Sequence, residues 1–173
     1  DVARGLAYLH QEKIVHRDIK GGNVLVSDQG VAKLSDFGTS MMLGDSTTAA
    51  GTRRLCGTPY FMAPEVMKGE TYGRKADVWS FGGLLVQMAT GSPPWKSMSF
   101  NSIPQLLMHV VTEKSPPPHE SSETITPALR ALMMRCFQFD ATLRPTAAEL
   151  LQDPFLQEAD LPPPPISSSA SRS

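Results

Sequence analysis

Two short polar motifs contain the residue types that could do chemistry. The stretch His16-Arg17-Asp18-Ile19-Lys20-Gly21-Gly22-Asn23 has the pattern H-R-D-x-x-x-x-N, and Asp36-Phe37-Gly38 follows a strand and a turn later. Together they place two carboxylates, Asp18 and Asp36, and the amide of Asn23 on neighbouring loops. One carboxylate can accept a hydroxyl proton, while the other carboxylate and the amide can hold Mg²⁺ against nucleotide phosphates. Because Mg²⁺ prefers oxygen ligands, the pattern indicates phosphoryl transfer.

The hydrophobic pattern between the motifs predicts a small hairpin that brings them together. Val24-Leu25-Val26 is a short apolar strand, residues 27–30 are turn formers, and residues 31–35 return as the second arm. Because this hairpin starts after Asn23 and ends at Asp36, both side chains should lie at the same edge.

The rest of the chain is predicted to be mainly helical. One apolar stripe at helical spacing consists of Val78, Phe81, Leu85 and Met88, and apolar residues on other faces indicate a buried core helix. This helix should have Asp77 as its N-cap and end at Gly91. Further helices are predicted over residues 1–12, from Pro64, from near Pro104, from Thr126-Pro127 through Phe137, and from the capping box Thr146-Ala147-Ala148-Glu149.

Two segments lack hydrophobic periodicity. Residues 39–57 are rich in Thr, Ser, Ala and Gly, and so long a stretch without an element of its own is usually a functional loop. After Leu161 come four prolines, an isoleucine and serines, which predict a disordered tail. We therefore expect a folded domain over residues 1–156 and a Pro/Ser-rich tail over residues 157–173.

Composition narrows the class of protein. The 173 residues suit a single domain, and a net charge of -1 without a basic stripe gives little support to nucleic-acid binding. The two cysteines, Cys56 and Cys136, favour a reducing compartment such as the cytoplasm over a disulfide framework. No apolar run reaches the roughly 18 to 20 residues that a membrane span needs. The chain starts at Asp1 inside a helical pattern, so we expect a natural N-terminus to be missing.

Five motifs in order resemble those of eukaryotic protein kinases. They are the H-R-D and D-F-G motifs above, Ala63-Pro64-Glu65, Asp77-Val78-Trp79-Ser80-Phe81-Gly82 and Leu143-Arg144-Pro145. The resemblance implies a mainly α fold: a kinase-like C-terminal lobe, helical, with a small β-hairpin that carries the catalytic and metal-binding loops. Lys20 and the phrase from Gly57 to Glu65 resemble those of Ser/Thr-specific kinases. That phrase, together with His16 to Asn23 and Met88 to Trp95, resembles the Ste-type branch, in particular mitogen-activated protein kinase kinase kinases. Phe61 and Gln87 depart from that branch, which more often has Trp and Glu there.

The resemblance implies roles for the polar residues of both motifs. Asp18 would be the catalytic base or would orient the substrate hydroxyl, although a loop aspartate can also simply bind backbone N–H groups. Lys20 would neutralise the transferring phosphate of ATP. Asn23 and Asp36 would hold Mg²⁺, although both are also common turn residues.

Other residues would support or regulate this site. His16 would orient the loop, Phe37 would pack to direct Asp36, and Asp77 would tie the core helix to the catalytic loop. Glu65 and Arg144 would form a buried ion pair. Regulation would involve a phosphate captured by Arg17, with Thr52 as the first candidate and Ser40, Ser46, Thr47 and Thr48 as alternatives. Thr58 would instead contact Asp18 and Lys20.

The sequence leaves three hypotheses about function open. The first is a protein serine/threonine kinase that acts on a protein substrate, possibly a mitogen-activated protein kinase kinase, under an upstream activating kinase. The second is an inactive kinase-like docking module, against which the intact Asp18, Asn23 and Asp36 argue. The third is an adaptor that uses Pro162 to Pro165. The Gly-rich loop and strand lysine of kinases are absent from these residues, so we expect residues 1–173 alone to be inactive.

Overall fold

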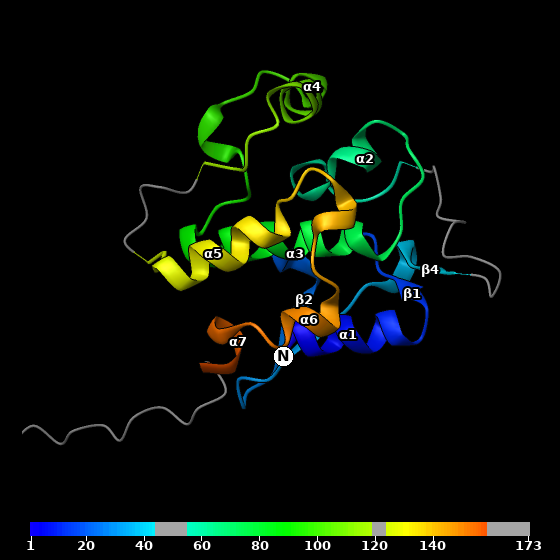
Figure 1. The fold of residues 1–173 in the computed structure, drawn as a ribbon, viewed down its shortest axis with the longest axis vertical. Coiled ribbons are helices and arrows are strands. Elements are labelled where there is room, and N and C mark those ends of the chain that lie inside the picture. The colour runs from blue at the N-terminus through cyan, green and yellow to red at the C-terminus, as the bar shows by residue number, and fades with distance from the viewer. Residues whose placement is uncertain (44–54, 119–123, 159–173) are drawn as a thin grey trace, which may run out of the picture.

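A long buried helix, α3 (Arg74–Thr90), forms the centre of the molecule. The structure, a computed structural model, describes residues 1–43, 55–118 and 124–158 (Figure 1). Side chains of α3 are buried on every face from Ala76 to Val86, as expected for a helix that is apolar nearly all round. Gly91 ends α3 with a left-handed φ of 71°, a conformation that glycine adopts without steric cost.

Six further helices occur in the described residues. They are α1 (Val2–Gln11), α2 (Pro64–Met67), α4 (Ile103–Glu113), α5 (Pro127–Cys136), α6 (Ala147–Leu150) and α7 (Pro154–Glu158). Of these, α1 and α5 make the main helix contacts with α3. Helix α5 lies alongside α3, α1 packs against α6, and α2 contacts α4 (Figure 1). None of these described helices combines the length and the apolar character that a membrane crossing requires.

Local capping explains where several helices begin. Thr126 accepts a hydrogen bond from the Leu129 N–H at the start of α5. Thr146 and Glu149 form the predicted capping box at the start of α6. Such short-range bonds satisfy backbone N–H groups that have no partner inside the helix.

The start of α3 was predicted wrongly. The helix begins at Arg74 after Gly73, so Asp77 lies in its first turn and is not the N-cap. Asp77 instead bonds to the loop that contains His16 and Arg17. A polar residue before an apolar run resembles a cap in sequence, and only long-range contacts distinguish the two cases.

The predicted fold class is also wrong, because the strands do not form one hairpin. Strands β2 (Val24–Val26) and β3 (Ala32–Leu34) make the expected antiparallel pair, with Val24 opposite Leu34. A second antiparallel pair joins β1 (Ile14–Val15) to β4 (Met41–Met42). The chain therefore leaves one sheet through the H-R-D motif and returns to it after the D-F-G motif. A two-residue strand such as β4 shows no detectable alternation, and the sequence therefore assigned it to the polar loop.

Candidate active site

Asp18, Lys20 and Thr58 form a closed polar triangle. The Thr58 hydroxyl donates to Asp18 Oδ1 at 2.7 Å, and Lys20 Nζ donates to Thr58 Oγ1 at 2.8 Å. Lys20 Nζ also lies 2.8 Å from Asp18 Oδ2. The loop between β1 and β2 supplies Asp18 and Lys20, while Thr58 comes from the segment before α2. These contacts hold a carboxylate and an ammonium group side by side.

The same contacts set the ionisation of Asp18. Burial raises the pKa of this carboxyl, but hydrogen bonds from Lys20, Thr58 and Asn23 outweigh burial and bring the pKa below its ordinary value of 3.8. Asp18 is therefore a carboxylate at neutral pH, and it can accept a hydrogen bond from a hydroxyl group.

His16 holds the backbone at the start of this loop. The buried ring accepts a hydrogen bond from the Asp18 N–H at Nδ1 (3.3 Å), and Nε2 lies 3.0 Å from the Ser35 carbonyl oxygen. Because Nδ1 accepts this hydrogen bond, Nε2 is the ring nitrogen that can donate to the Ser35 carbonyl oxygen. His16 thus connects the H-R-D motif with the strand end before Asp36.

Asp77 is fully buried and receives three hydrogen bonds. Its Oδ2 accepts from the His16 N–H at 2.8 Å and lies 2.9 Å from His10 Nε2, while Oδ1 accepts from the Arg17 N–H at 2.8 Å. A carboxylate taken out of water needs such partners. Asp77 therefore attaches the beginning of the H-R-D loop, residues 16–23, to α3.

The hairpin brings Asn23 and the strand end before Asp36 together. The Ser35 N–H and hydroxyl both donate to the Asn23 carbonyl oxygen, at 2.9 and 3.0 Å. The Asn23 amide nitrogen donates to the Asp18 backbone oxygen and to Oδ2, at 2.8 and 2.9 Å. The Asn23 amide nitrogen thus makes both of these hydrogen bonds to Asp18, which leaves the amide oxygen out of this contact.

The donor set of Asn23 and Asp36 fits Mg²⁺. Asp36 is exposed, and one of its oxygens accepts the Gly38 N–H at 3.2 Å. One carboxylate and one amide oxygen, completed by nucleotide phosphates, are ligands that Mg²⁺ accepts. Within the described ranges, no group of three or more His, Cys, Asp or Glu side chains could hold a metal ion by itself. The residues would therefore need the phosphates to complete the site.

Among the described residues, Phe37 contacts the loop through its ring, which packs against the His16 ring. Its ring centroid lies 5.2 Å from that of His16, at an interplanar angle of 57°. The side chain is nevertheless 48% exposed. Phe37 thus packs beside the residue that orients Asp18, with half of its surface open.

Arg17 faces the start of the segment that was predicted to be regulatory. Its Nε donates to the Thr39 carbonyl oxygen, and Nη2 donates to the Ser40 carbonyl oxygen at 3.3 Å. Burial raises the pKa of the Tyr72 hydroxyl, which the neighbouring Arg17 charge and hydrogen bond only partly offset. Thr52, the first predicted phosphorylation site, lies outside the described residues, as do the alternatives Ser46, Thr47 and Thr48.

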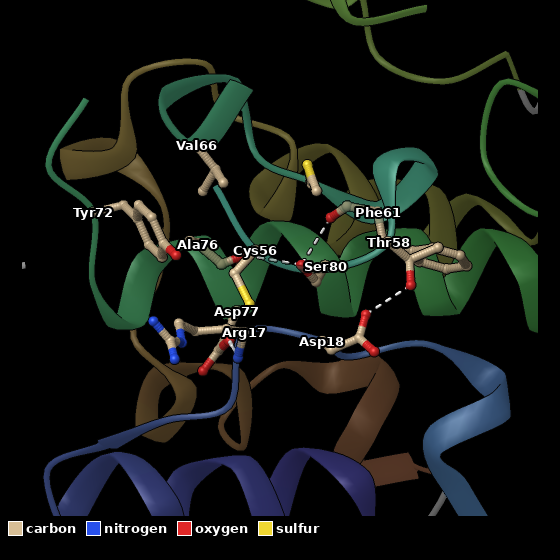
Figure 2. Close-up of a pocket in the computed structure, with 11 residues that line it drawn as sticks. Arg17, Asp18, Cys56, Thr58, Phe61, Val66, Tyr72, Ala76, Asp77 and Ser80 are labelled. Carbon is tan, nitrogen blue, oxygen red and sulfur yellow. Dashed lines mark hydrogen bonds between the residues drawn. The ribbon is translucent and has the colours of Figure 1, made fainter. Parts of the chain in front are cut away.

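A small cavity is lined in part by Arg17 and Asp18 of the H-R-D loop. Figure 2 shows Arg17 and Tyr72 beside each other in its wall, with Asp18 and Thr58 joined by a hydrogen bond. The cavity has a volume of about 10 Å³, which is close to the space of a single water molecule. It is too small for a nucleotide, so it belongs to the packing beneath the loop.

Glu65 and Arg144 form the expected ion pair away from the loop. Two bonds of 2.6 and 2.7 Å join the guanidinium to both carboxylate oxygens. Arg144 also donates to the Gln138 carbonyl oxygen at 2.7 Å and lies over the Trp79 ring, 5.0 Å from its centroid. This network joins α2 to the segment before α6.

Gln87 makes a contact that the sequence did not predict. Its Oε1 accepts the Gly21 N–H at 2.9 Å, across 66 residues of sequence. The one sequence signal for Gln87 is that this position more often holds Glu in the branch that the chain resembles. No local pattern indicates that a residue near the end of α3 reaches the H-R-D loop.

The sequence matches the profile described as "Protein kinase domain" over residues 1–156. It is 43% identical to mitogen-activated protein kinase kinase kinase 2 of Arabidopsis thaliana over 152 residues, which are 88% of this chain and 23% of that protein. It is 38% identical to mitogen-activated protein kinase kinase kinase A of Dictyostelium discoideum, over 92% of this chain and 16% of that protein. The human mitogen-activated protein kinase kinase kinase 1 is 38% identical over 87% of this chain and 10% of its own length.

The chain thus spans about a quarter or less of the length of these relatives. The profile match is to a kinase domain without distinction of lobes, so the predicted assignment to a C-terminal lobe does not stand. The match over most of the sequence establishes the family. This chain belongs to the protein kinase domain family.

Proposed function

We propose that this chain contributes the catalytic loop of a protein serine/threonine kinase that transfers the γ-phosphate of ATP to a protein hydroxyl group. The observation that supports this proposal most is the triangle of Asp18, Lys20 and Thr58, with the Asn23 amide bonded to Asp18. Kinase catalysis depends mainly on positioning and charge stabilisation, and this arrangement offers both.

The ionisation of Asp18 suggests how it would act. A carboxylate with a lowered pKa is a weak base, so Asp18 would orient the substrate hydroxyl and accept its proton late. Lys20 would place its ammonium group beside the transferring phosphate. Bound Mg²⁺ would neutralise phosphate charge, and Asn23 and Asp36 are the residues that would hold it.

The relatives support a finer assignment to the Ste-type branch. Three proteins named mitogen-activated protein kinase kinase kinases share between 38% and 43% of aligned residues with this chain. We therefore propose a place in a mitogen-activated protein kinase cascade, with a mitogen-activated protein kinase kinase as the substrate and an upstream kinase as the activator.

Phosphate transfer by the full-length protein tests this proposal. The assay supplies labelled ATP, Mg²⁺ and either a mitogen-activated protein kinase kinase or a generic protein substrate, and the labelled amino acid is then identified. Asp18→Asn should lower kcat by about 10²-fold or more. Asp28→Asn is the matched control, because Asp28 is an exposed turn residue between β2 and β3. Label on tyrosine alone, or transfer that Asp18→Asn leaves unchanged, would contradict the proposal.

A further inference from the structure

The proposed catalytic loop, residues 16–23, is attached to α3 at two places, and only the first involves a charged residue of α3. Asp77 accepts the N–H groups of His16 and Arg17 at the start of the loop. About three helical turns later on α3, Gln87 accepts the Gly21 N–H near the end of the loop. Ile19, between these points, is fully buried.

We propose that Gln87 is a positioning residue, whose amide oxygen holds the end of the catalytic loop so that Lys20 keeps its contacts with Asp18 and Thr58. The inference rests on the proposed kinase function. Gly21 directly follows Lys20, whose Nζ lies 2.8 Å from both Thr58 Oγ1 and Asp18 Oδ2. A shift of the Gly21 backbone therefore moves the Lys20 main chain, and misplacement by about 1 Å can cost a large part of the catalytic rate.

The absence of a side chain at Gly21 makes the contact with Gln87 possible. A Cβ at this position would lie 2.8 Å from Gln87 Oε1 and 3.1 Å from its Cδ. The Gln87 side chain would have to move away, and the hydrogen bond would be lost. Gly22 differs, because a Cβ there would meet only the Lys20 Cε at 3.8 Å, an ordinary contact. The two glycines thus provide a matched pair for a test.

Hydrogen exchange of the Gly21 amide measures the contact directly. The full-length protein is labelled with ¹⁵N-glycine, and the Gly21 signal is assigned by its loss in Gly21→Ala. Gln87→Met keeps the side-chain volume but removes the acceptor, so exchange at Gly21 should become about three- to tenfold faster. Gln87→Glu keeps an acceptor oxygen and should restore the slow exchange. An unchanged rate in Gln87→Met would overturn the proposal.

Kinetics then test whether the contact positions the loop. Gln87→Met and Gly21→Ala should each lower kcat about tenfold, with an unchanged KM for the protein substrate, while Gly22→Ala should lower kcat by less than Gly21→Ala, because its Cβ makes only an ordinary contact. In a Gln87→Ala background, Gly21→Ala should cost little more, because the side chain that its Cβ displaces is already gone. Equal effects of Gly21→Ala and Gly22→Ala on kcat, or additive losses of kcat in the double variant, would contradict the positioning role of Gln87.

The exchange experiment uses neither ATP nor substrate, so its result is independent of the proposed function. If Asp18→Asn left phosphate transfer unchanged while Gln87→Met accelerated Gly21 exchange, the kinase proposal would fail and the contact would stand as a structural one. If Asp18→Asn abolished transfer while Gln87→Met changed neither exchange nor kcat, only the positioning role would fail.

Discussion

The Thr58 hydroxyl donates a 2.7 Å hydrogen bond to Asp18 Oδ1, across 40 residues of sequence. Thr58 directly precedes a short 3₁₀ turn, Pro59–Phe61, and the catalytic loop supplies Asp18. The segment that leads to α2 is thereby joined to the proposed catalytic carboxylate. This single bond affects both the position and the ionisation of Asp18.

Removal of the Thr58 hydroxyl should change the pH dependence of activity. The Thr58 hydrogen bond lowers the pKa of Asp18, so Thr58→Val should raise that pKa. The carboxylate form exists above the pKa, and activity that needs it is lost as the pH falls. The acidic limb of kcat/KM should therefore move to higher pH in Thr58→Val and stay in place in Thr58→Ser. An unshifted limb in Thr58→Val would show that the bond does not tune Asp18.

Asp77→Asn should destabilise the fold. The carboxylate accepts from two backbone N–H groups and from the His10 ring, and an amide offers only one oxygen. At least one buried N–H group should then lose its partner, at a cost of about 1 to 3 kcal/mol in the free energy of unfolding. Urea unfolding measures the change. Asp28→Asn is the control, since an exposed substitution should stay within about 0.5 kcal/mol. Equal unfolding midpoints for the two variants would contradict the role of Asp77 as an anchor.

Separating the buried ion pair should be costly, while replacing both partners should cost less. Glu65 and Arg144 are 8% and 1% exposed, so Arg144→Met leaves a carboxylate without its partner in the interior. The expected loss is about 3 to 5 kcal/mol. Adding Glu65→Gln to Arg144→Met should recover part of this loss, because the unpaired charge is removed. Glu70→Gln, at an exposed pair with Lys68 (3.8 Å), should change stability by less than about 1 kcal/mol. If the losses in the free energy of unfolding simply added in the double variant, Glu65 and Arg144 would not be energetically coupled.

Asp36→Asn should remove catalysis with little effect on stability. Asp36 has a left-handed φ of 58°, which asparagine tolerates well, and its exposed side chain accepts only the Gly38 N–H among the described contacts. The substitution should therefore leave Tm nearly unchanged. Turnover should fall about 10²-fold or more, because the substitution removes a carboxylate ligand from the proposed Mg²⁺ site. A titration of activity against Mg²⁺ and a thermal melt check the two parts, and a collapse in Tm would mean that Asp36 is structural first.

The hairpin between the motifs could be predicted because its information is local. Val24 and Leu34 pair across a turn of a few residues, and apolar arms with turn formers between them are visible in sequence. The same applies to the capping box of Thr146 and Glu149, whose partners are three residues apart. The strand pair of Ile14 with Met42 could not be predicted, because it joins distant residues and has no repeating pattern.

The sequence by itself determined which chemical groups are present, and it determined that Asn23 and Asp36 follow one another across a short hairpin. The residues themselves do not place Thr58 on Asp18, a contact that only the family resemblance implied, and the tertiary structure decided it. The tertiary structure also decided that Asp77 lies in the first turn of α3 rather than at its N-cap, and that Gln87 reaches Gly21. The physical reason is the range of the interactions. Turns and caps depend on neighbouring residues, whereas these contacts depend on where the buried helix α3 and the segment before α2 pack against the loop.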